Sequence, residues 1–494
     1  MRNHSVINII ASVLLVGLLA GCAVGPDFKR PASPAVATYT TSPLPDFTAS
    51  APTKIGGSQR FITGDGGNSQ WWQEFGSAKL NILIAEALQA SPTLAGAQAT
   101  LRQAQEVYSG QAGLTRYPQV DAGLTGQQQR FNPNSSGLPG DARDFDLYNA
   151  GVGVRYKFDL AGGNRRALEA LEARSDYQRY QLDGARLTLV SNIVTTAISQ
   201  ARLWEQIQIS QTILRAQEEQ LELTRERLRL GQVASSEVLV LQTEVEQTRA
   251  GIPLLLNQLQ QSQHLLAVLV GQPPSARSLP SFSLQEFTLP VELPLIVPSE
   301  LVRTRPDIQA AEALLQAANA EYGVAVANLY PQLNLSASLG SQALTTGALF
   351  GSGSAVWSLI GQLTQPLFNP GLPAEKRAAL AVFDAAAAHY QVVVLDSLRN
   401  VADVLRALEN DAQRLSALSS ADTAAQGSLE LMQRQYRLGA ASYMQLLIAQ
   451  QQAQRTQIPL IESKAQRLIN SAVFYQAMGS DINAGLSAAS LIKR

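Results

Sequence analysis

The sequence repeats one plan twice, and this repeat limits the possible folds more than any other feature. The segment Arg229-Leu230-Gly231 recurs 208 residues later as Arg437-Leu438-Gly439. Pro92 and the segment Tyr117-Pro118-Gln119 likewise recur as Pro306 and Tyr330-Pro331-Gln332. A nearly constant offset of about 210 residues indicates an internal duplication, with short insertions or deletions between the copies.

Each half is predicted to contain a helix, two strands, a very long helix and a last helix, in that order. We expect the first repeat over residues 62–300, the second over 301–479 and a C-terminal tail over 480–494. The expected strands cover about 117–131, 147–159, 330–344 and 355–368. The expected helices cover about 92–115, 163–230, 236–270, 306–328, 374–438 and 442–478. Ser91 followed by Pro92 is a typical helix start.

The four expected strands have one apolar and one polar face. From Tyr148 to Phe158 apolar side chains alternate with glycine and polar side chains, and the run from Leu333 to Leu339 does the same. Runs of about 10 residues suit tilted membrane strands. Aromatic residues lie towards the ends of these runs, where an interfacial girdle would sit: Tyr117, Tyr148, Tyr156, Phe158, Tyr330, Trp357 and Phe368. The alternative is a soluble sheet with one buried face.

The long helices follow a heptad pattern that predicts coiled-coil packing. In the first half Ile193, Ile207, Leu214, Leu221 and Leu228 are spaced by seven or fourteen residues, and the second half has an equivalent row. The helix at 163–230 is about as long as the two shorter helices of its half placed end to end, roughly 100 Å. Without the strands, this pattern would indicate only a helical bundle.

Four membrane strands cannot close a barrel, because even small barrels have about eight. Open strand edges are not tolerated in lipid. The chain is therefore expected to oligomerise through its strands, although the pattern does not set the number of copies.

The N-terminus carries an export signal. Arg2 precedes an apolar stretch over residues 6–19, which is too short to span a bilayer as a helix. The stretch ends in Leu18-Leu19-Ala20-Gly21-Cys22, which resembles the bacterial lipobox, so we expect a signal peptide over 1–21 and lipid on Cys22. The alternative is a chance cysteine after a secretory signal. Proline-rich residues 22–61 are expected to form an extended, lipid-anchored tether over the surface.

Composition excludes several functional classes. Lys+Arg (38) balance Asp+Glu (39), which argues against a nucleic-acid partner. One cysteine and three widely separated histidines argue against a metal centre. The sequence lacks GxSxG, HExxH and GxxxxGK[ST] motifs, so no enzymatic activity is expected. We expect no cofactor apart from the covalent lipid on Cys22.

The segment from Cys22 to Pro31 resembles the mature start of the lipoprotein branch of outer membrane factors, the TolC-like exit ducts of tripartite efflux pumps. The segments Trp71-Trp72, Ser91-Pro92, Arg305-Pro306-Asp307-Ile308 and Tyr330-Pro331 resemble other parts of this family. The resemblance covers nearly all of residues 22–479. It implies an α+β membrane protein, a homotrimer whose twelve-stranded transmembrane barrel (four strands per chain) continues into a periplasmic α-helical coiled-coil barrel.

The resemblance also implies partners and sites. It predicts a lipid-anchored protein of the Gram-negative outer membrane that works with a periplasmic adaptor (membrane fusion protein) and an inner-membrane pump of the RND class. The two helical turns would bind the adaptor: Arg229, Leu230, Gly231, Arg437, Leu438 and Gly439. The periplasmic aperture would involve Tyr436, Arg437 and, as a candidate luminal charge, Asp422.

Acidic aperture residues that the family often has are absent here, because the matching positions hold Leu239, Gln445 and Ile448. Met444 and Ile448 are expected either to form an apolar constriction or to be buried in the coiled coil.

Three functions remain open at this stage. The first is passive efflux of small molecules such as antibiotics, dyes and solvents. The second is the exit duct of a type I protein secretion system. The third is a coiled-coil lipoprotein spacer without a pore, which the alternating strands argue against.

Overall fold

A computed structural model describes residues 23–64, 69–137, 139–276 and 279–480 of the protein. The expected signal peptide, Cys22 and all but the first residue of the expected C-terminal tail lie outside these residues. The chain divides into two compact units, one formed by residues 23–31, 100–178 and 310–391, the other by 32–99, 179–309 and residues from 392 onward.

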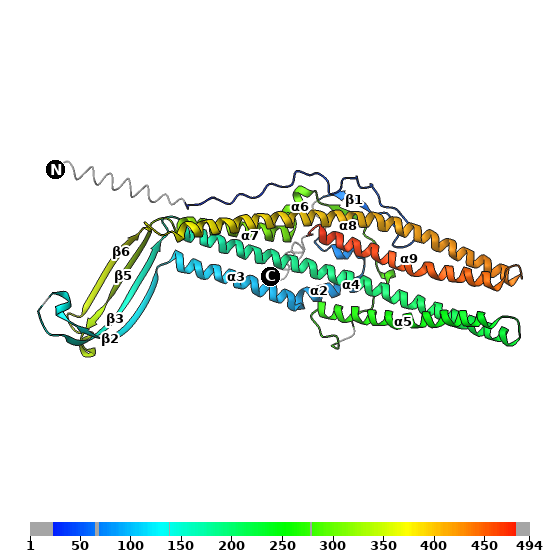
Figure 1. Ribbon diagram of the computed structural model, residues 1–494, viewed down its shortest axis with the longest axis horizontal. Coiled ribbons are helices and arrows are strands. Elements are labelled where there is room, and N and C mark those ends of the chain that lie inside the picture. The colour runs from blue at the N-terminus through cyan, green and yellow to red at the C-terminus, as the bar shows by residue number, and fades with distance from the viewer. Residues whose placement is uncertain (1–22, 65–68, 138, 277–278, 481–494) are drawn as a thin grey trace. The chain divides into compact units, whose positions relative to one another are not determined.

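The first unit contains a four-stranded antiparallel sheet in the order β2-β3-β5-β6 (Figure 1). Its strands are β2 (Gln119–Phe131), β3 (Arg143–Phe158), β5 (Gln332–Ala343) and β6 (Ala355–Thr364). Short 3-10 turns, η2 (Pro133–Ser136) and η4 (Thr346–Ala348), lie in the β2–β3 and β5–β6 connections. The strands β2 and β6 are the two edges, and neither has an outer partner within the described chain.

Two strand ends differ from the sequence expectation. The strand β3 begins at Arg143 and not near residue 147, because it pairs along the whole of β2 out to Phe131↔Arg143. The strand β6 ends at Thr364, so Phe368 lies in the connection that follows it. The hairpin β2–β3 therefore extends past β5, whose last residue, Ala343, pairs with Tyr148.

Four helices contribute residues to both units: α3 (Pro92–Arg116), α4 (Gly163–Arg229), α7 (Pro306–Ala327) and α8 (Gly371–Arg437). The helices α4 and α8 have 67 residues each, or about 100 Å at 1.5 Å per residue. Asp159 caps the start of α4, since its carboxylate accepts hydrogen bonds from the amides of Asn164 (3.0 Å) and Arg165 (2.8 Å).

The second unit contains two helical hairpins, α4 with α5 (Ser235–Leu269) and α8 with α9 (Tyr443–Ala477). The helices α5 and α9 have 35 residues each. A capping box of Ser442 and Gln445 starts α9. Several of the expected heptad positions are fully buried, for example Ile193 in α4 and Val401 and Leu408 in α8.

Shorter elements complete the second unit: β1 (Arg60–Thr63), η1 (Trp71–Phe75), α2 (Ala78–Ala90), η3 (Leu284–Glu286), β4 (Glu292–Leu295) and α6 (Pro298–Thr304). The strands β1 and β4 pair in parallel across more than 200 residues of sequence. An aromatic cluster packs them against α9: the ring of Trp71 stacks on that of Tyr475, with centroids 5.2 Å apart, and Phe75 and Phe474 are fully buried beside it.

The segment that precedes β1, which we call the N-terminal strap (residues 23–59), has almost no regular secondary structure, and a few of its residues are packed into the fold. In the second unit its Thr48, Ile55 and Gln59 are buried. Arg467 of α9, fully buried, donates to the carbonyls of Gly57 (2.7 Å), Ala49 and Ile55 (3.4 Å each) and to the hydroxyl of Thr48 (3.0 Å). The strap carbonyls turn inward because this guanidinium satisfies them.

In the first unit, the start of the strap is bound by a second arginine. Arg166 of α4, only 4% exposed, donates to the carboxylate of Asp27 (2.7 Å) and makes longer contacts with the carbonyls of Val24 and Gly25. Gly25 adopts a φ of +92°, and a Cβ there would lie 2.9 Å from the Cα of Gly323. Glycine is therefore required for this close approach of strap and helix.

Candidate channel lining and helical tips

The register of the sheet places most apolar side chains of the four strands on one face, with Val356 and Ile360 of β6 as exceptions on the opposite face. Opposite residues across the ladders are Val120↔Val154, Val152↔Leu339 and Leu339↔Trp357, and each such row stays on one face. Leu124, Leu339, Trp357, Leu359 and Leu363 are between 64% and 78% exposed within the chain. A row of exposed leucines on a sheet is the pattern of a lipid-facing surface.

The height of this apolar face fits a membrane. On β3 it runs from Tyr148 to Phe158, ten residue steps or about 33 Å along the strand. With the usual strand tilt of about 40°, this corresponds to an apolar band of about 25 Å. Beyond Tyr148 the same face carries charged residues, Asp146 and Asp144, the second opposite Arg130.

The seven aromatic residues expected to form a girdle lie towards two ends of the sheet. Tyr117, Tyr156, Phe158, Tyr330 and Phe368 lie in or next to the strand ends that connect to the helices. Tyr148 and Trp357 lie towards the other end, opposite Ala343 and Leu339 respectively. The rings of Tyr156 and Phe158 make an edge-to-face contact with centroids 4.9 Å apart. Whether these residues meet lipid headgroups stays a prediction.

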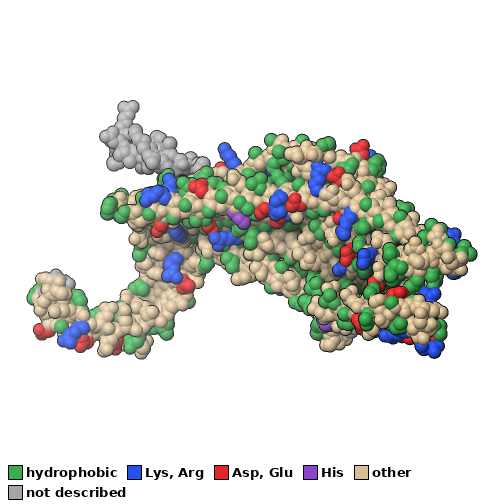
Figure 2. All heavy atoms as spheres, turned by 45° about the vertical axis from the view of Figure 1, so that its right-hand side comes forward, with side chains coloured by type: hydrophobic (Ala, Val, Ile, Leu, Met, Phe, Trp, Pro, Cys, Tyr) green, Lys and Arg blue, Asp and Glu red, His purple; other side chains and the backbone are tan. Residues whose placement is uncertain are grey.

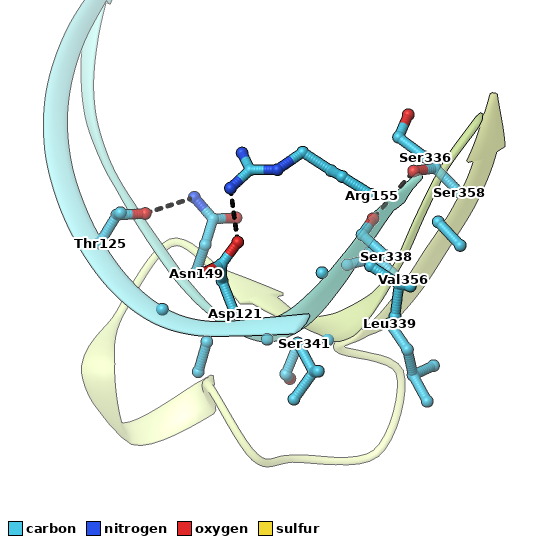
Figure 3. Close-up of a pocket in the computed structure, with 18 residues that line it drawn as sticks. Asp121, Thr125, Asn149, Arg155, Ser336, Ser338, Leu339, Ser341, Val356 and Ser358 are labelled. Carbon is cyan, nitrogen blue, oxygen red and sulfur yellow. Dashed lines mark hydrogen bonds and ion pairs between the residues drawn. The ribbon is translucent and has the colours of Figure 1, made fainter. Parts of the chain in front are cut away.

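The opposite face of the sheet is polar and concave (Figure 3). It forms an open groove in which Asp121, Thr125, Asn149, Arg155, Ser336, Ser338 and Ser358 point to the same side. Cross-strand contacts tie these side chains together: Arg155 pairs with Asp121 (2.5 Å), Asn149 donates to Thr125 (3.4 Å), and Ser338 bonds with Ser358 (2.8 Å). Such a surface offers polar contacts to water and to solutes.

The two helical tips have the same geometry. After α4, the amide of Gly231 donates to the carbonyl of Leu228 and that of Gln232 to Arg227, both at 2.9 Å. After α8, Gly439 and Ala440 repeat this pattern with Tyr436 and Gln435. Gly231 and Gly439 have φ values of +72° and +73°, which makes glycine the favoured residue at both turns.

Each tip exposes one leucine and one arginine. Leu230 is 57% exposed and Leu438 is 83% exposed. Arg229 is paired with Glu226 (2.5 Å), which raises the pKa of Arg229, whereas Arg437 donates only to the carbonyl of Gln433 (3.4 Å) within the described chain. An apolar side chain beside a cation on a protruding turn is a suitable contact for a protein partner.

Below the tips, Arg227 of α4 joins the two hairpins. Its guanidinium carbon lies 5.8 Å from the ring centroid of Tyr436 and 5.2 Å from that of Tyr443, and it also donates to the hydroxyl of Tyr436. The hydroxyls of Thr224 and Tyr443 are 2.9 Å apart. An apolar cluster of Leu221, Val238, Leu241, Val245 and Leu447 lies nearby, so the contact between the hairpins is both apolar and polar.

The structure places the expected aperture residues in different environments. Tyr436 contacts a neighbouring helix, where its partner is Arg227. Arg437 is exposed and donates to a carbonyl of its own helix, and it has no contact with another helix among the residues that the structure describes. Asp422 is half-buried and accepts a hydrogen bond from Thr456 (2.7 Å). Met444 and Ile448 are 51% and 59% exposed, so they are not buried within a single chain.

Sequence reasoning missed Arg227, Thr224 and Tyr443. The available signal was the repeat itself, because Tyr436 aligns with Leu228 in the first copy and the adjacent Arg227 is therefore at tip height. What the sequence does not reveal is that α4 and the α8–α9 hairpin face each other at this height.

Further along the hairpins, amide and carboxylate side chains connect the helices. Gln451 donates to Glu244, and Gln206 donates to Glu462 (3.0 Å). Burial raises the pKa of Glu244 above its ordinary value. These side chains give the two hairpins polar contacts in addition to the apolar cluster nearer the tips.

The comparisons with known proteins agree on one family. A sequence profile described as "Outer membrane efflux protein" matches residues 83–272 and 297–480. The pyoverdine export outer membrane protein OpmQ of Pseudomonas aeruginosa is 31% identical over 419 residues, which covers 83% of this chain and 87% of the relative. The cation efflux system protein CusC of Escherichia coli is 27% identical, with 93% and 96% of the two chains covered.

A solved structure of the outer-membrane channel OprN superposes with a TM-score of 0.82 at 26% identity, covering 93% of this chain and 99% of that one. The chain therefore belongs to the outer membrane efflux protein family, TolC-like outer membrane factors, and is an outer-membrane exit channel of efflux pumps.

Proposed function

We propose that three copies of the chain form a channel, each contributing four strands to a twelve-stranded transmembrane barrel. The observation that carries this proposal is the sheet with two unpaired edges, β2 and β6, and one apolar face. In a bilayer each unpaired backbone group costs several kcal/mol, so the edges must pair with other copies. The repeated element order supports an internal duplication as the origin of the chain.

The helices supply a second argument for neighbouring copies. The helix α8 is long and apolar enough to cross a membrane, yet only 11% of its most apolar stretch is buried within the chain. Figure 2 shows hydrophobic side chains at many places on the visible face of the molecule, interspersed with charged ones. Leu380, Val382, Val392 and Leu395 of α8 are 41–66% exposed. We interpret this surface as contact area for adjacent helices of a periplasmic coiled-coil barrel.

Transport through this channel is passive, and its solutes are small molecules such as antibiotics, dyes and solvents. Two relatives are named for solutes as different as pyoverdine and cations, which supports a duct that accepts what the pump delivers. The polar face of the sheet, with its serines, asparagines and ion pair, lines the exit. Lipid on Cys22 anchors each copy in the outer membrane, with no other cofactor and no catalysis.

The tips provide the contact with the partners. Leu230 and Leu438, each beside an arginine, bind a periplasmic adaptor, which connects the channel to an inner-membrane pump of the RND class. The Arg227–Tyr436–Tyr443 contact lies next to these tips and holds the two hairpins together. Opening of the periplasmic aperture therefore requires this contact to break or to shift.

A cysteine-crosslinking experiment tests the trimer. The only native cysteine is Cys22, so cysteines introduced at Thr125 on β2 and, one at a time, along β6 report pairing between copies. We expect at least one pair to yield dimers and trimers under oxidising conditions and no larger species, because the ring closes at three. A ladder that continues beyond three, or monomer alone for every pair, would refute the proposed ring.

Photocrosslinking tests the tips. A photoreactive residue at Leu230 or Leu438 in intact cells should capture a periplasmic adaptor, identified by mass spectrometry. Leu254 of α5 is the matched control, since it is similarly exposed (61%) but lies away from both turns. Capture of an adaptor that belongs to a protein secretion system would mean that the channel exports proteins and not small molecules. Capture from Leu254 but from neither tip would mean that the adaptor binds away from the tips.

A further inference from the structure

The charged residues of the sheet are distributed unequally between its two faces. All seven charges of the four strands lie in β2 and β3, and β5 and β6 have none. The polar face carries Asp121, Arg143, Arg155 and Lys157, and the apolar face carries Arg130, Asp144 and Asp146. Three cations and one anion leave the polar face with an excess of two positive charges per chain.

Only one of the three cations on the polar face is neutralised. Arg155 pairs with Asp121 at 2.5 Å across the β2–β3 ladder (Figure 3). For Lys157, opposite Asn334, and for Arg143, opposite Phe131, the described residues provide no acidic partner. On the other face, Arg130 lies 3.7 Å from Asp144, outside the apolar band. The excess charge therefore belongs to the solvent-facing groove and to its two ends.

We propose that Lys157 and Arg143 make the strand-lined part of the channel prefer anionic solutes over cationic ones. This inference rests on the proposed trimer, in which the polar face lines the pore and the excess becomes six positive charges. Rings of Lys or Arg select anions in other pores. In the second unit, the positions that match the acidic aperture residues of the family hold Leu239, Gln445 and Ile448, none of them acidic.

The size of the effect follows from Coulomb's law. In water, one such fixed charge changes the local concentration of a monovalent ion about 10 Å away roughly twofold. The Debye length is about 10 Å at 0.1 M salt and about 30 Å at 0.01 M, so the preference should be strong at low salt and weak at high salt.

The test is the reversal potential of the purified channel in planar bilayers under a roughly tenfold KCl gradient at low ionic strength. The native channel should pass chloride better than potassium. The double variant Lys157→Gln/Arg143→Gln should lower the chloride-to-potassium permeability ratio at least about twofold. Asp121→Asn frees Arg155 and should raise the ratio. Arg130→Gln, on the opposite face, is the matched control and should leave it unchanged.

The outcomes separate this inference from the proposed function. Conductance with a potassium preference, or a chloride preference that the double variant leaves intact, would overturn the inference and keep the pore. An equal shift in Arg130→Gln would also overturn it, because the assignment of faces would be wrong. Channels without any conductance would overturn the proposed pore and the inference with it.

Discussion

Replacing Arg467 by alanine should detach the N-terminal strap from α9. The guanidinium makes two short contacts, with the carbonyl of Gly57 (2.7 Å) and the hydroxyl of Thr48 (3.0 Å), and two longer ones. Burial lowers the pKa of Arg467 to about 10, so the group remains cationic at neutral pH and its hydrogen bonds are charge-assisted. Removing two such bonds costs about 3–6 kcal/mol, since each contributes roughly 1.5–3 kcal/mol.

Hydrogen exchange measured by mass spectrometry is the suitable assay. The strap amides are themselves bonded, for example Thr48 to the carbonyl of Gln59 at 3.0 Å, so they exchange only when the strap opens. A loss of about 3–6 kcal/mol corresponds to exchange over residues 48–60 that is roughly a hundred to ten thousand times faster.

The matched control is Arg455→Ala, an exposed arginine on the same helix, which should leave strap exchange unchanged. Arg467→Lys should give an intermediate rate, because lysine keeps the charge but not the planar fork. If strap exchange in Arg467→Ala stays within tenfold of the native rate, the buried guanidinium does not hold the strap.

Four further outcomes are expected. Arg227→Gln removes two cation–π contacts worth roughly 1–2 kcal/mol together and should raise the open probability in bilayers without reducing trimer yield; unchanged gating would contradict this role. Because burial raises the pKa of Glu244, the folded state binds its proton more tightly than the unfolded state, so stability should fall as pH rises above the ordinary pKa of 4.5; thermal unfolding of Glu244→Gln should lose this part of the pH dependence. Gly439→Val places a β-branched residue at φ +73°, which costs about 1–2 kcal/mol, and should reduce adaptor capture while trimers persist. Cys22→Ser should abolish acyl labelling of the protein, and labelling of this variant would contradict the proposed lipid on Cys22.

The strands were predictable because, in the proposed barrel, one face of each strand meets lipid and the other meets water. Apolar and polar side chains therefore alternate with a period of two. From Tyr148 to Phe158 the alternation identifies both the strand and its two faces. The extension over residues 143–146 was missed because the pattern inverts there: Phe145 lies on the polar face, as Leu147 does, and Asp144 and Asp146 lie on the apolar one. Outside the apolar band the outward-facing side chains do not meet lipid in the proposed barrel, so they need not be apolar. The alternating pattern therefore ends where the band ends.

The contacts that sequence reasoning missed join residues far apart in the chain. Proline content correctly indicates that the strap has little regular structure, but no local pattern says that its carbonyls turn towards Arg467, about 410 residues away. The pair β1 and β4 has only four residues per strand, too few for a periodic signal. Arg227 was overlooked for a related reason: arginines are common on the surface of heptad helices, and only its contacts with Tyr436 and Tyr443 distinguish this one.

The clamp formed by Arg467 also constrains the order of events during export. A secreted chain emerges N-terminus first, so residues 48–57 leave the inner membrane long before α9 does. Their inward-facing carbonyls then have no partner except water, and the strap cannot settle until nearly the whole chain has crossed. The first segment to arrive is thus among the last to fold, and a truncated chain that ends before Arg467 would expose a loose N-terminus to periplasmic proteases.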